Sequence, residues 1–130
     1  MKTPRDIRHQ NRIEAVKELF TWEMQRRGGV DVSNFQSTNE SVGRIIQNLA
    51  EIDGEIEKAA SKLPLKQVNL IDLAILRFAI FELIIKKEGL FKVVVDEAVE
   101  IGKEFGGDSS PSFINGVLGN VISNHNLDKD

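Results

Sequence analysis

LAILRFAIFEL, at residues 73–83, is the stretch that decides the fold of this chain. From Asn69 to Lys87 apolar residues occur on every side of a helical wheel, and a helix that is apolar all round is a buried central helix. Arg77 lies within it, and a buried charge requires a partner because an unpaired one is costly. We predict that Arg77 forms a buried ion pair with Glu97 or Glu82. Contact with a ligand is the alternative.

The amino-terminal segment predicts a long first helix. Thr3 is placed as an N-cap, with Pro4 at the first helical position and Asp6 as the acid of a capping box. Apolar residues then recur at steps of three and four. Gly28-Gly29 ends the helix, since glycine tolerates the left-handed cap conformation.

Helical spacing returns from about Thr38 to Leu63, where Pro64 ends it. Gly54 lies inside this region, so we predict either one bent helix or two helices that meet at Gly54. Two further helices follow the central one, from Lys92 to Phe105 and from Ser110 to about Asn124. Sustained strict alternation is absent, so the fold class is all-α, with one domain over 1–130.

The bulk composition limits the kind of protein this can be. The chain has 130 residues and no cysteine, which excludes disulfides and thiolate metal sites. No apolar run approaches the roughly 20 residues needed to span a bilayer, and Met1 to Arg27 lacks the apolar core of a secretion signal. We therefore expect a cytoplasmic protein without membrane contact.

Positive charge is concentrated at the amino terminus. Residues 1–17 hold five basic and two acidic side chains, a net charge of +3, so the remaining residues carry −6 of the total of −3. Arg5, Arg8 and Arg12 share one helical face. Basic residues in a first turn oppose the helix dipole by about 0.3–1 kcal/mol each, and phosphate binding is a natural reason for them. A solvated face is the alternative.

Catalytic patterns are absent from the sequence. The two histidines, His9 and His125, lie at opposite ends of the chain, away from any acidic cluster with metal-site spacing. The sequence also lacks a phosphate loop and a dinucleotide-binding glycine motif. We expect no catalysis, no metal and no cofactor.

The pair Asn115-Gly116 lies inside a helical pattern, so a turn is disfavoured. We predict that Gly116 permits close approach of a second helix and that Asn115 bonds a neighbouring backbone. Both residues would then be structural.

Two blocks follow the central segment: Asp96-Glu97-Ala98-Val99-Glu100 and Phe113-Ile114-Asn115-Gly116-Val117-Leu118. Together with Ala74-Ile75-Leu76-Arg77, in this order and spacing, they resemble the signature of the NusB family of transcription antitermination factors. Further matches extend the resemblance over nearly the whole chain: Arg12, Ala15-Val16, Leu19-Phe20, Trp22, Asp72, Glu82-Leu83, Lys103 and Phe105-Gly106.

The resemblance implies a helical domain of about seven helices, packed as two helical subdomains over about 1–63 and 64–130. It also implies RNA binding without catalysis. Members of the family bind the small-subunit ribosomal protein NusE, and the heterodimer recognises the boxA element of nascent ribosomal RNA. It joins RNA polymerase with other Nus factors and suppresses premature termination. Some members form homodimers.

Site residues are also implied by the resemblance. RNA contacts fall on Arg8 and Arg12 of the first helix, beside Arg5, and on Phe105, Ser109 and Phe113. Exposed phenylalanines would suit single-stranded RNA because unpaired bases stack on aromatic rings. The alternative is that both are core residues. Asp72 matches an acidic position at the NusE surface.

Departures from the family pattern leave other functions open. The arginine cluster of the family is denser; here Asp6, His9 and Gln10 interleave. One alternative is a helical protein-interaction module without RNA binding. Another is a NusB-like domain associated with a ribosomal RNA methyltransferase, although the chain carries no methyl-donor motif.

Overall fold

The computed structural model describes residues 2–61 and 63–129, and every regular element in these ranges is helical. Six α-helices form the fold: α1 (Pro4–Arg27), α2 (Glu40–Gln47), α3 (Leu49–Ala59), α4 (Leu70–Ile80), α5 (Phe91–Phe105) and α6 (Ser110–Asn124). A 3-10 turn (Leu65–Gln67) precedes α4, and a π-helical turn (Phe81–Lys86) continues it. The predicted all-α class is confirmed, and the number of helices comes close to the seven expected.

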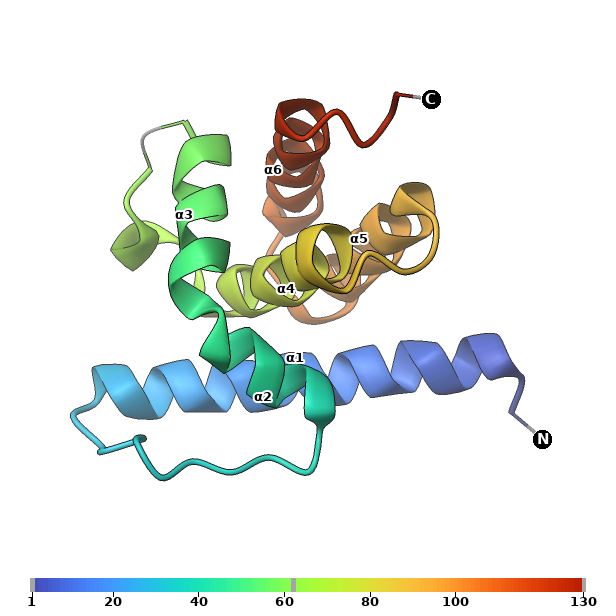
Figure 1. The fold of residues 1–130 in the computed structure, drawn as a ribbon. Coiled ribbons are helices and arrows are strands. Elements are labelled where there is room, and N and C mark those ends of the chain that lie inside the picture. Colours follow the sequence, from blue (N-terminus) through green and yellow to red (C-terminus); the bar gives the residue numbers. More distant parts are fainter. Residues whose placement is uncertain (1, 62, 130) are drawn as a thin grey trace.

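Helix α4 is the centre of the fold. It contacts each of the other five α-helices, and Figure 1 shows α3, α5 and α6 gathered around it on one side of the long α1 helix. Every residue from Asp72 to Ile84 is buried, so the predicted central helix is confirmed. Because α4 packs against helices from both halves of the chain, the division into subdomains near residue 63 stays a prediction.

The carboxyl end of the central helix widens into the π-helical turn. The backbone N–H of Lys87 donates to the carbonyl of Glu82, five residues earlier, at 3.0 Å. Lys87 itself takes the left-handed conformation, with φ of 55°, and ends the helix before Gly89. The turn holds Glu82 buried, where it meets a side chain of α1.

Helix α1 begins and ends where the sequence predicts. The Thr3 hydroxyl accepts a hydrogen bond from the Asp6 N–H at 3.1 Å, and the Asp6 carboxylate accepts one from the Thr3 N–H at 3.2 Å. This reciprocal capping box satisfies two amide groups that the first turn leaves free. Gly28 caps the carboxyl end.

The interruption between α2 and α3 lies at Asn48, so the predicted break at Gly54 is wrong. Asn48 has φ −110° and ψ 22°, outside helical geometry, and its side-chain amide donates to the Arg44 carbonyl at 2.7 Å. That bond competes with regular helix propagation, as asparagine side chains often do. Gly54 is an interior residue of α3, whose neighbours supply enough buried apolar contact to outweigh the cost of a helical glycine.

The predicted close packing at Gly116 is also wrong. Asn115 and Gly116 are exposed, and a Cβ at Gly116 would meet nothing within 4 Å. Helices α5 and α6 instead approach at Gly102, where a Cβ would lie 2.7 Å from Ile114 Cδ1. The amide that bonds a distant backbone is Asn120, which donates to the Ala59 carbonyl at 2.8 Å.

Gly102→Ala and Gly116→Ala are expected to differ in their effect on the free energy of unfolding. A methyl group at Gly102 collides with a fully buried Ile114, so we expect the free energy of unfolding to fall by about 1–2 kcal/mol. Gly116→Ala adds a better helix former in open space and should be neutral or stabilising by up to about 1 kcal/mol. Urea unfolding measures both, and equal midpoints for the two variants would contradict the packing at Gly102.

Candidate functional site

Arg77 is buried and paired, but its predicted partners are wrong. Its Nη1 donates to Glu23 Oε1 at 2.7 Å, and its Nε and Nη2 donate to the two carboxylate oxygens of Asp53, both at 2.9 Å. Glu82 and Glu97, which the sequence suggested, are engaged by side chains of α1 instead. The buried arginine therefore joins α4 to α1 and α3.

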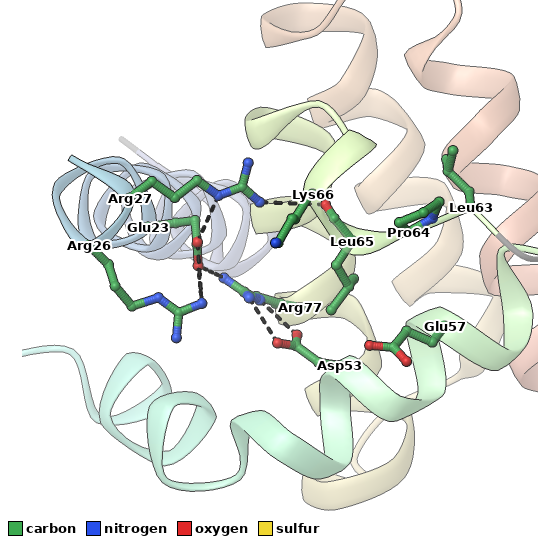
Figure 2. A pocket seen from close by; sticks show the side chains of 10 residues that line it. All are labelled: Glu23, Arg26, Arg27, Asp53, Glu57, Leu63, Pro64, Leu65, Lys66 and Arg77. Carbon is green, nitrogen blue, oxygen red and sulfur yellow. Dashed lines mark hydrogen bonds and ion pairs between the residues drawn. The ribbon is translucent and has the colours of Figure 1, made fainter. Parts of the chain in front are cut away.

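This network lies at an open recess of about 1030 Å³ between the end of α1, α3 and the segment 63–66. Figure 2 shows Arg26 and Arg27 reaching over the rim toward the Glu23 carboxylate, which accepts a hydrogen bond from each at 2.9 Å. Burial alone would raise the pKa of Glu23, but the hydrogen bonds from Arg77 and Arg27 outweigh it and lower that pKa. Because these charges already satisfy one another, the network serves to join α1, α3 and α4.

Arg12 is occupied in a second ion pair. Its guanidinium donates to both oxygens of the buried Glu82, at 2.8 and 3.0 Å, and only 14% of its side chain is exposed. The hydrogen bond with Glu82 raises the pKa of Arg12 in spite of burial. Its neighbour His9 is hydrogen-bonded through Nδ1 to Glu97 of α5. Arg12, which the sequence placed on a nucleic-acid face, and its neighbour His9 therefore tie α1 to the rest of the fold.

Arg5 and Arg8 remain on the surface. Both are exposed, and neither forms an ion pair with another residue that the structure describes. Arg8 lines a polar recess of about 470 Å³, together with Lys86 and the start of α2. Of the three arginines on this helical face, these two are free to meet an anion.

The aromatic candidates differ in exposure. Phe105, at the end of α5, is 39% exposed, and the Lys17 ammonium lies 5.4 Å from the centroid of its ring. Phe113 is partly buried and packs against the core, which favours the core alternative for this residue. Ser109 is exposed next to α6, and its hydroxyl makes no capping bond to the helix.

The loop between α5 and α6 is fastened by Ser110. Its hydroxyl oxygen accepts a hydrogen bond from the Gly107 N–H at 3.0 Å, and the side chain is buried. A Cβ at Gly106 would lie 2.6 Å from Ser110 Cβ, so glycine is required there. Phe105 and Ser109 thus flank a closely packed turn.

Asp72 lies deeper than a surface contact requires. The residue is 5% exposed, and Oδ1 finds no hydrogen-bond partner among the described residues. Burial raises the pKa of Asp72, and a hydrogen bond with Ser110 offsets part of that effect. The expected surface carboxylate is therefore buried next to the start of α6, and its role in partner binding stays a prediction.

Three side chains that make contacts between distant helices escaped the sequence reasoning: Glu23, Asp53 and Lys17. Glu23 had a detectable signal, because it continues the apolar stripe of α1, four residues after Leu19. A carboxylate on a buried stripe predicts a cationic partner. Lys17 had no such signal, since its contact with Phe105 depends on how α1 crosses α5.

Neither a metal centre nor a membrane segment is found in the described part of the chain. Three or more histidine or carboxylate side chains nowhere converge there as a metal ion would need. None of the described helices combines the length and the apolar character needed to cross a membrane.

Comparison with known proteins identifies the family. The NusB family model matches residues 5–123. The transcription antitermination protein NusB of Dehalococcoides mccartyi (strain CBDB1) is 38% identical over 116 residues, covering 89% of this chain and 78% of the relative. The protein of the same name from Chloroflexus aggregans is 34% identical and covers 95% of this chain and 91% of its own length. A solved structure of T. maritima NusB superposes with a TM-score of 0.77 at 30% identity, over 95% of this chain and 93% of that one. The chain belongs to the NusB family.

Proposed function

We propose that this protein is a transcription antitermination factor that binds RNA together with the ribosomal protein NusE. The observation that carries the proposal is the family match over residues 5–123, supported by relatives that bear the name transcription antitermination protein. The boxA element of nascent ribosomal RNA is the proposed ligand, and RNA polymerase with other Nus factors is the proposed assembly. We place this activity in the cytoplasm and attribute no catalysis to the protein.

The surface chemistry supports RNA as the ligand. Arg5 and Arg8 are exposed cations on α1, and an exposed phenylalanine, Phe105, stands at the end of α5. Cations that neutralise phosphates give the affinity, and aromatic rings stack unpaired bases. Ser109, in the loop that follows Phe105, offers an exposed hydroxyl that makes no capping bond. Arg12 contributes by holding α1 in place, and Phe113 by packing against the core.

NusE would act as a protein partner near the amino-terminal end of α4, where Asp72 is the proposed contact. The carboxylate is buried beside Ser110, so partner binding there would also reach the loop that carries Ser109. Self-association through the RNA-binding face would compete with RNA binding. Sedimentation over a range of protein concentrations would reveal the self-association.

We expect boxA RNA to bind more tightly when NusE is present, with an affinity that falls steeply as salt rises. Each phosphate contact contributes about −0.7 to the slope of log K against log salt for single strands. Fluorescence anisotropy of a labelled boxA RNA, with and without NusE, measures both quantities. An RNA of scrambled sequence is the control.

The absence of RNA binding at every salt concentration, with and without NusE, would overturn the proposal. Binding to NusE alone would then favour the protein-interaction module. Equal affinity for boxA and scrambled RNA would limit the activity to general RNA binding.

A further inference from the structure

Lys17 and Phe105 form a pair that nothing in the family match explains. Lys17 lies on α1 and Phe105 at the end of α5, and the ammonium sits 5.4 Å from the ring centroid. Phe105 is the one aromatic side chain among the large apolar residues exposed in the described part of the chain. Lys17 is exposed and forms no ion pair with a described carboxylate. A free cation therefore covers an accessible ring.

The energies of the two possible contacts of this ring differ. A cation–π contact at an exposed site contributes about 0.5–1 kcal/mol. Stacking of a nucleobase on an aromatic ring contributes about 1–3 kcal/mol. A base can therefore displace the ammonium from the ring. The displaced ammonium, with three donors on a flexible stem, remains within reach of the phosphate attached to that nucleotide.

We propose that Lys17 and Phe105 together bind one nucleotide of single-stranded RNA, with the base on the Phe105 ring and its phosphate on the Lys17 ammonium. In the free protein Lys17 covers the ring, and RNA binding moves it from the ring to the phosphate. This inference rests on the proposed RNA binding and adds Lys17 as a contact.

Nuclear magnetic resonance tests the displacement directly. The Lys17 ammonium lies over the ring, so we expect the protons on the adjoining Cε to be shifted upfield by the ring current in the free protein. Phe105→Leu should abolish that shift without RNA, which confirms its origin. Saturating boxA RNA, added with NusE to the wild-type protein, should move the Lys17 signals back toward ordinary lysine positions.

Binding measurements test the phosphate contact. Lys17→Met keeps the apolar stem and removes the charge, so we expect the salt slope to become shallower by about 0.7 and the affinity to fall about fivefold at 0.1 M salt. Phe105→Leu should weaken binding by a larger factor, between roughly 5- and 150-fold, as the loss of one stacked base implies. Lys58→Met, at an exposed position in α3, is the matched control and should leave both quantities unchanged.

The outcomes separate this inference from the proposed function. If the wild-type protein binds boxA RNA but Lys17→Met keeps its affinity and slope, Lys17 merely shields the ring and the nucleotide site is wrong. Lys17 signals that stay upfield in the complex lead to the same conclusion. If the wild-type protein binds no RNA at all, the proposed function fails and the nucleotide site fails with it.

Discussion

Arg77→Ala is expected to lower the free energy of unfolding by about 3–5 kcal/mol, the range for removing one partner of a buried ion pair. The substitution leaves the carboxylates of Glu23 and Asp53 facing an emptied site between three helices. Small domains are stable by only about 5–15 kcal/mol, so much of the margin would be lost. Urea unfolding followed by the fluorescence of Trp22, the one tryptophan, measures the change.

Two further variants serve as controls for this prediction. Arg26→Ala removes an arginine from the exposed rim of the same network and should cost no more than about 1 kcal/mol. Combining Arg77→Met with Glu23→Gln and Asp53→Asn removes the buried charges together, and we expect this triple variant to be more stable than Arg77→Ala. An Arg77→Ala protein with the wild-type unfolding midpoint would show that the network contributes nothing to stability.

The central helix could be predicted from the sequence because its information is local. An apolar residue on every side of a helix has one physical solution, which is burial, and a charge within it must be paired. The identity of the partners is not local. Glu23 and Asp53 lie 54 and 24 residues away from Arg77, and they meet it only through the angles at which α1 and α3 cross α4.

The same limit explains the errors at Gly116 and Gly54. A glycine within a helical pattern shows that the position tolerates the absence of a side chain. The neighbour that would make glycine necessary belongs to another helix and is not visible in the local sequence. Gly102 and Gly116 look alike in the sequence, yet only Gly102 faces a buried side chain of the adjacent helix. The break at Asn48 was marked by a side chain that bonds the backbone carbonyl of Arg44, one turn earlier, a signal weaker than glycine in most patterns.

The candidate site was predicted in part for a similar reason. Helical spacing correctly places Arg5, Arg8 and Arg12 on one helix, but spacing cannot tell which of them a neighbouring element will use. The π-helical turn after α4 brings Glu82 to Arg12 and leaves Arg8 free. A row of equivalent arginines in the sequence thus becomes one structural residue and two exposed ones.

Arg12→Ala is therefore expected to change the stability of the protein, and Arg8→Ala its affinity for RNA. Arg12→Ala leaves Glu82 buried without its bidentate partner, so we expect the free energy of unfolding to fall by roughly 2–4 kcal/mol, somewhat less than for Arg77 because the pair retains contact with water. Arg8→Ala should unfold like the wild-type protein but bind boxA RNA less tightly, with a shallower salt slope. Urea unfolding and the anisotropy titration, run on both variants, give the comparison.

A second substitution decides why Arg12 matters. Glu82→Gln in the Arg12→Ala background removes the stranded charge, so it should restore part of the lost stability if the ion pair is the reason for the loss. It cannot restore a phosphate contact. An Arg12→Ala protein that keeps wild-type stability yet loses RNA affinity would return Arg12 to the RNA-binding face. If Arg12→Ala instead loses stability as expected, the salt slope reflects only the cations that the fold leaves unpaired, because the charge of Arg12 is already balanced by Glu82.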